Sequence, residues 1–178
     1  LALPTETASS LFRVQSQTIA NLNQHVTGNI AQTHLLSKIF LNNVKVMIFC
    51  ILFSFLYGSG AIFILTWNAS VIGAAVGNFI RSHMAQFADA TGFHKLGAYF
   101  YVTSLSILRY AIHGVPEIFA YIIAGLAGGI LSMAIMKHDF GTKQFENVLL
   151  DVSDLVLLAV LVLFIASIVE VFVTPALF

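Results

Sequence analysis

The stretch VMIFCILFSFLYGSGAIFILTWNASVIGAAVGNFI, residues 46–80, decides the fold because it carries no formal charge over its whole length. A helix of about 20 apolar residues crosses the ~30 Å hydrocarbon core of a bilayer. Residues 46–80 are therefore long enough for one membrane span and most of a second. Continuous apolar runs of this kind favour helices over the short alternating strands of a membrane barrel.

The composition of the whole chain supports a membrane location. Of its 178 residues, 58% are hydrophobic and 9% are charged, whereas soluble domains carry about 25% charged residues. So few charges cannot cover a water-facing surface, which excludes a water-soluble monomer, a disordered chain and a coiled coil. Eight basic residues balance eight acidic ones, so we expect no nucleic-acid partner. The lone cysteine, Cys50, excludes an intrachain disulfide.

A polar block precedes the apolar part of the chain and suggests two regions. We predict an amphipathic helical region in residues 1–43 and a transmembrane helical bundle in residues 44–178. Apolar residues such as Leu11, Val14 and Ile19 recur at steps of three to five, which is typical of an amphipathic helix. This face either lies on the bilayer or packs against the spans, and its few Lys and Arg residues favour packing. We also expect an apolar span upstream of Leu1.

Turn and interface residues predict the limits of the first two spans. We place the first span at 44–66 and the second at 69–87, with the break at residues 66–70. Trp67 suits the lipid–water boundary and Asn68 suits a helix cap. Asn42 and Asn43 are the predicted caps of the first span.

The second half of the chain predicts further helices at 98–112, 118–136 and 151–173. Between the first two of these, we predict a helix break at His113–Glu117. Gly114 is a poor residue for a helix interior, and Pro116 lacks a backbone donor. The predicted fold is an all-α, polytopic transmembrane helical bundle of about four to five spans.

Two motifs of small residues predict close helix packing. Gly73 and Gly77 form one GxxxG motif, and Gly125 and Gly129 form another. Small residues let helix backbones approach closely in lipid, where no hydrophobic force drives helices together. Either motif can form the seam of a homodimer or pack within one protomer, and the sequence leaves both open.

Arg109, His113 and Glu117 recur every four residues and form the predicted intramembrane polar cluster. At this spacing they share one helix face, provided that the helix is unbroken. Charged groups are costly inside a bilayer, so they pair with each other or line a wet cavity. One interpretation is an Arg109–Glu117 ion pair that fixes the helix break. The other is an ion or substrate site at a discontinuous helix, as in many transporters.

A second polar set predicts helix caps and contacts between helices. Its members are Asn42, Asn43, Asn68, Asn78 and Arg81. The six histidines lack the spacing of a metal site, and motifs of serine hydrolases and phosphate-binding loops are absent from the sequence. We therefore expect no catalytic residues, no metal, no cofactor and no enzymatic activity.

The order of several short motifs resembles the stage II sporulation protein M family of multi-span bacterial and archaeal membrane proteins. The motifs cover roughly residues 40–136. In chain order, they are Ile39-Phe40-Leu41-Asn42-Asn43, Tyr57-Gly58-Ser59-Gly60, Asn68, Gly73, His113-Gly114-Val115-Pro116-Glu117 and Ile122-Ile123-Ala124-Gly125-Leu126-Ala127-Gly128. One departure is Ile112, where the family tends to have proline. The resemblance marks five positions as a structural or functional core, namely Asn43, Asn68, His113, Gly114 and Glu117.

The resemblance also implies a function. Members in spore-forming bacteria help to engulf the forespore as membrane anchors for cell-wall-degrading partners. We therefore expect an integral, multi-pass protein of the cell membrane that acts as a scaffold or partner-binding subunit. Its expected partners are the lipid bilayer and either further copies of itself or other membrane proteins. The alternative is a transporter or channel for a small solute, ion or lipid, which would use the predicted polar cluster.

Overall fold

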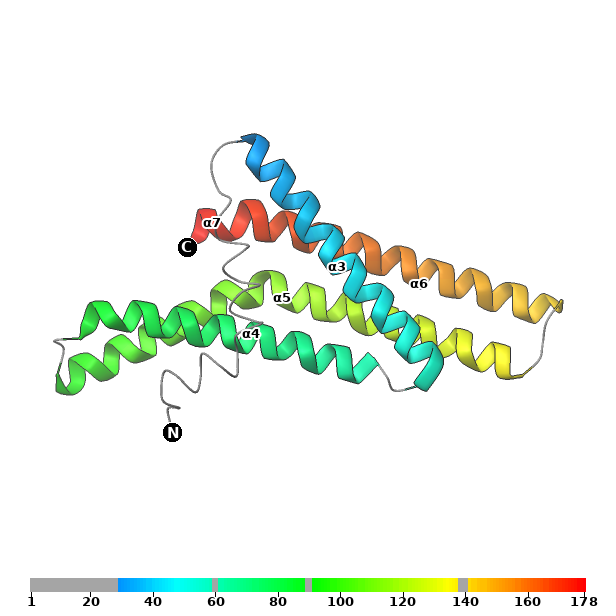
Figure 1. Ribbon diagram of the computed structural model, residues 1–178, viewed down its shortest axis with the longest axis horizontal. Helices are drawn as coiled ribbons and strands as arrows, with labels where there is room; N and C mark the ends of the chain where they lie inside the picture. The colour runs from blue at the N-terminus through cyan, green and yellow to red at the C-terminus, as the bar shows by residue number, and fades with distance from the viewer. Residues whose placement is uncertain (1–28, 59–60, 89–90, 138–140) are drawn as a thin grey trace. The chain divides into compact units, whose positions relative to one another are not determined.

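The computed structural model describes residues 29–58, 61–88, 91–137 and 141–178, and every regular element in these ranges is helical (Figure 1). The α-helices are α3 (Asn29–Tyr57), α4 (Ala61–Met84), α5 (Gly92–Met136), α6 (Lys143–Ile168) and α7 (Thr174–Leu177). The short 3₁₀-helix η1 (Ala85–Phe87) extends α4, and the π-helix η2 (Val169–Val173) joins α6 to α7.

Four helical stretches in the described ranges are long and apolar enough to cross a membrane. They are Gln32–Tyr57, Ala61–Phe87, Gly92–Met136 and Lys143–Leu177. Large apolar side chains face outward from them, as Phe63 and Leu157 do with 66% of their surface exposed. Such side chains suit contact with lipid tails, which are as apolar as they are. The prediction of an all-α, polytopic membrane bundle is confirmed.

The chain divides into two compact units. The first, which we call the core unit, contains residues 36–68 and 112–178. Its buried centre draws side chains from α3, α5 and α6, among them Cys50, Tyr121 and Leu163. Phe40 of α3 meets Phe164 of α6 edge to face, with 5.5 Å between ring centres. Contacts between helices, rather than exclusion of water, hold this centre together.

Leu163 is expected to matter far more to stability than an exposed leucine of the same helix. Leu163 has no exposed surface, whereas Leu157 is 66% exposed. A soluble core loses both transfer energy and packing on Leu→Ala, but lipid is itself apolar, so only the packing loss remains. We expect Leu163→Ala to lower the free energy of unfolding by about 1–2 kcal/mol and Leu157→Ala by under about 0.5 kcal/mol, measured by reversible denaturation in detergent. Equal losses would contradict the buried position of Leu163.

The second unit, which we call the hairpin unit, contains residues 69–111 and the start of α3. Here α4 and the first half of α5 pack together. The Ser106 hydroxyl donates to the Val76 carbonyl oxygen over 3.3 Å, and the rings of Phe79 and Tyr110 lie 6.4 Å apart, edge to face. Gly92, with φ of +57°, begins α5 after the turn in a conformation that suits glycine.

Helix α5 is continuous, so the predicted break at His113–Glu117 is wrong. Pro116 lies inside the helix and Gly114 is buried in it. Membrane helices tolerate proline because neighbouring helices and local adjustments satisfy the freed carbonyl group. With 45 residues, α5 is roughly 67 Å long, about twice the ~30 Å of hydrocarbon.

The predicted break at residues 66–70 is also wrong. The first span ends at Tyr57, and Gly58, with φ of +65°, stops the helix. The Ser54 hydroxyl donates to the Gly58 carbonyl oxygen over 2.8 Å. Trp67 and Asn68 lie inside α4, where the Asn68 amide donates to the Ile64 carbonyl oxygen over 3.0 Å. Asn68 is therefore no helix cap.

Other predicted boundaries shift as well. The division at residues 43 and 44 falls inside α3, so Asn42 and Asn43 do not cap a helix. Helix α5 begins at Gly92 rather than at residue 98. Helix α6 begins at Lys143, where the Thr142 hydroxyl accepts a hydrogen bond from the Phe145 backbone over 3.2 Å. The part of the predicted amphipathic region up to residue 28 lies outside the described residues.

Candidate functional site

Polar side chains from three stretches of the core unit gather around Glu117. We call Asn43, His113, Glu117, Glu170 and Thr174 the polar cluster. His113 and Glu117 lie one turn apart on α5, and Glu170 and Thr174 have the same spacing across η2 and α7. Side chains four residues apart share a helix face. Asn43 and Thr174 are buried, with 7% and 4% of their surface exposed.

Hydrogen bonds connect the polar cluster across helices. The Asn43 amide donates to Glu117 Oε1 over 2.5 Å and so joins α3 to α5. Thr174 Oγ1 lies 3.4 Å from His113 Nδ1 and donates to the Val169 carbonyl oxygen over 3.1 Å. These contacts join the C-terminal end of the chain to α5. Polar side chains in lipid commonly stabilise helix pairs in this way.

Glu170 brings a second carboxyl group to the polar cluster. It is half-buried within the apolar stretch Lys143–Leu177 and lies four residues before Thr174, which contacts His113. Its backbone belongs to η2, and single π turns often occur at functional sites. Carboxyl and imidazole groups inside membrane-spanning helices offer the chemistry that binds and releases a proton.

Arg109 does not make the predicted ion pair with Glu117 among the described residues. Its guanidinium group lies 5.4 Å from the centre of the Phe79 ring, within the hairpin unit. This is a cation–π distance. Glu117 has Asn43 as its hydrogen-bond partner instead. Of the three predicted members, only His113 and Glu117 are thus placed in the polar cluster of the core unit.

The remaining members of the second polar set have separate positions. Asn42, Asn78 and Arg81 are exposed on α3 and α4. Asn68 is half-buried and bonds to its own helix. Among the residues that the structure describes, Asn43 is the member of this set that donates a hydrogen bond to another helix.

The two glycine motifs differ in what surrounds them. A Cβ built on Gly125 would lie 2.8 Å from Ala61 Cβ, and one on Gly128 would overlap the Ile51 carbonyl oxygen. The motif on α5 is therefore filled by α3 and the start of α4 within the protomer. Gly73 and Gly77 are exposed on α4, and apart from their own helical turns no described atom lies within 4 Å of a Cβ built on either.

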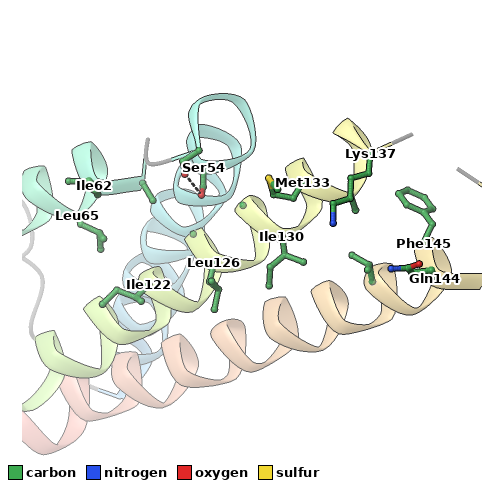
Figure 2. Close-up of a pocket in the computed structure, with 16 residues that line it drawn as sticks. Ser54, Ile62, Leu65, Ile122, Leu126, Ile130, Met133, Lys137, Gln144 and Phe145 are labelled. Carbon is green, nitrogen blue, oxygen red and sulfur yellow. Dashed lines mark hydrogen bonds between the residues drawn. The ribbon is translucent and has the colours of Figure 1, made fainter. Parts of the chain in front are cut away.

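The core unit also contains a largely apolar groove of about 680 Å³ (Figure 2). Residues from α3, the start of α4, α5 and α6 line it. Figure 2 shows Ile122, Leu126 and Ile130 along α5, with Lys137 and Gln144 at the end of the groove where α5 gives way to α6.

Sequence reasoning missed two members of the polar cluster. One is Glu170, which lies within the last membrane-spanning stretch. An acidic residue inside an apolar run is itself a signal of a functional position. Thr174 gives no such signal, because threonine is common in membrane helices. In the described part of the chain, no three His, Cys, Asp or Glu side chains are placed to hold a metal ion.

Comparison with known proteins places the chain in a family. No curated protein and no solved structure shows significant similarity to it. The family model described as Stage II sporulation protein M matches residues 3–175, nearly the whole chain. Together with the four apolar helices, this match identifies the chain as a multi-pass membrane protein that belongs to the Stage II sporulation protein M family.

Proposed function

We propose that the chain acts in the cell membrane as a non-enzymatic scaffold that binds further copies of itself or other membrane proteins. The observation that carries this proposal is the open glycine face of α4. Gly73 and Gly77 are exposed, and nothing in the described part of the chain packs closely on them. The role is also the one that the family resemblance implies.

The filled motif on α5 supports this interpretation of the open one. Gly125 and Gly128 allow Ala61 and the backbone of Ile51 to come closer than any larger residue would permit. Gly73 and Gly77 offer the same spacing and the same lack of side chain on α4. A helix of a second molecule would find there the close backbone approach that stabilises helix pairs in lipid.

Bulky residues on the open glycine face are expected to dissociate the oligomer. We expect Gly73→Leu/Gly77→Leu to weaken self-association by roughly tenfold or more, equivalent to about 1.4 kcal/mol, because leucine side chains hold the helices apart. Leucine is a better helix former than glycine, so α4 itself stays intact. The measurement is energy transfer between labelled copies in liposomes, as a function of protein-to-lipid ratio.

A matched control is available in the same unit. Gly97 on α5 is also exposed with no described neighbour within 4 Å of a built Cβ, but it belongs to no GxxxG motif. Gly97→Leu should leave self-association unchanged. The contrary result is a double variant that associates as well as the wild type and also co-purifies with partner proteins as efficiently as the wild type does. That pair of results would contradict the scaffold role of this face.

Transport of a small solute, ion or lipid is a second candidate, favoured by the polar cluster. Glu117 and Glu170 place two carboxyl groups inside membrane-spanning helices, where ionisable residues often mark ion or proton pathways. For transport of protons or monovalent cations, Glu117→Gln should reduce flux into proteoliposomes at least tenfold. Asn78→Ala, at an exposed position of α4, should leave the flux unchanged. Absence of flux, or equal flux in wild type and Glu117→Gln, would eliminate this route.

A further inference from the structure

One wall of the groove in the core unit is apolar and is formed by α5. It follows α5 from Ile122 to Lys137, a distance of roughly 22 Å along the helix. This exceeds the ~15 Å of hydrocarbon in a single leaflet. Leu126, Ile130 and Met133 line it, and the first and last of these are more than half exposed. An extended hydrocarbon chain that enters from a membrane surface would fit along such a wall.

The polar groups of the groove gather at one end. Lys137 directly follows α5, and Gln144 is the second residue of α6 (Figure 2). Both therefore lie at helix ends, where membrane helices meet the headgroups. Basic pockets between transmembrane helices bind anionic lipid headgroups. An ammonium group and an amide donor at the end of an apolar groove match a phosphate joined to an acyl chain.

The lining favours a lipid over a second protein helix. Helices that associate in lipid need small residues at their contact. The small residues of this groove already serve contacts within the protomer, since Gly125 meets Ala61 and Gly129 lies against Ser54. The open wall consists instead of long side chains such as Leu126 and Met133, which adapt readily to a flexible chain.

We propose that this groove is a binding site for an anionic phospholipid, with an acyl chain along Leu126 and Ile130 and the headgroup phosphate at Lys137. The site is separate from the polar cluster and from the open glycine face of α4. It would make the stability or assembly of the protein depend on the anionic lipid content of its membrane.

A tryptophan reporter in the groove tests the proposal. The chain has one tryptophan, Trp67, so Trp67→Phe combined with Leu126→Trp places the only indole in the groove. The full chain is reconstituted in phosphatidylcholine vesicles with brominated phosphatidylglycerol or brominated phosphatidylcholine as quencher. We expect the anionic lipid to bind at the reporter about fivefold more tightly, as one lysine at a membrane surface provides.

Variants of two neighbouring lysines separate a site from general surface charge. Lys137→Gln should abolish the preference and Lys137→Arg should keep it, whereas Lys143→Gln should retain it because Lys143 does not line the groove. A reporter at Leu157→Trp, which is exposed on α6 outside the groove, should show no preference. Equal quenching by both lipids, a preference that survives Lys137→Gln, or a reporter shielded from both lipids by protein would overturn the proposal.

Discussion

Valine in place of Gly128 is expected to destabilise the core unit by about 3 kcal/mol or more, at the upper end of what overpacking costs. A Cβ at this position would overlap the Ile51 carbonyl oxygen and lie 3.0 Å from Ile51 Cα. These are backbone atoms of α3, so they cannot turn aside as the end of a flexible side chain can. Relief requires α3 and α5 to separate along their whole contact.

The measurement is the free energy of unfolding in detergent, followed by circular dichroism against a denaturant. Gly129→Ala is the matched control, because a Cβ there would lie 3.5 Å from Ser54 Oγ, an ordinary contact distance. It should change the free energy of unfolding by under about 0.5 kcal/mol. A Gly128→Val protein as stable as Gly129→Ala would show that α3 does not approach α5 at this point.

Loss of the Asn43 amide is expected to cost about 1–3 kcal/mol of stability. Asn43→Leu nearly preserves side-chain size but removes the donor to Glu117 Oε1. The Glu117 carboxyl group then loses its hydrogen-bond partner inside a membrane-spanning helix. Polar groups that lose their partner cost more than polar groups that are removed together.

This asymmetry gives the experiment its control. The double variant Asn43→Leu/Glu117→Leu should be more stable than the sum of the single variants predicts, with a coupling energy of about 0.6–1.7 kcal/mol as measured for hydrogen bonds between membrane helices. Asn42→Leu, at the exposed neighbouring position, should have little effect. Strict additivity of the two single variants would contradict a direct Asn43–Glu117 contact.

The scarcity of charge was enough to predict the fold class. Long uncharged runs leave few alternatives to helices in lipid, and the confirmed architecture follows from this one property. The family resemblance, drawn from motif order over residues 40–136, is confirmed by a match over residues 3–175. Both predictions rest on features spread along the chain, which tolerate errors at single positions.

Helix ends were predicted less well because the residues used to predict them occur both at helix ends and inside membrane helices. Trp67 and Asn68 suit an interface and a cap, yet they occupy the interior of α4, while Gly58 ends the preceding helix. Likewise, Pro116 breaks helices in water but is tolerated inside α5. In a bilayer, contacts with neighbouring helices determine whether such a residue ends a helix or lies inside it. These contacts cannot be read from the sequence alone.

The polar cluster shows where spacing along the chain is insufficient. The four-residue spacing of Arg109, His113 and Glu117 predicted an ion pair between Arg109 and Glu117. In the structure, the hydrogen-bond partner of Glu117 is Asn43, which lies 74 residues away in the sequence. The sequence predicts Asn43 as a cap of the first span, but it lies inside α3. Spacing rules describe faces of one helix, whereas this contact depends on how α3 packs against α5.

Labelling of single cysteines introduced on α6 tests most directly whether the helices cross the membrane. In a Cys50→Ser background, Glu146→Cys lies near the start of α6 and Leu157→Cys about 21 Å along the helix from Lys143. In lipid nanodiscs, a membrane-impermeant maleimide should label Glu146→Cys readily and leave Leu157→Cys unlabelled until the protein is denatured. Equal labelling of both positions in the native protein would contradict a membrane-spanning α6.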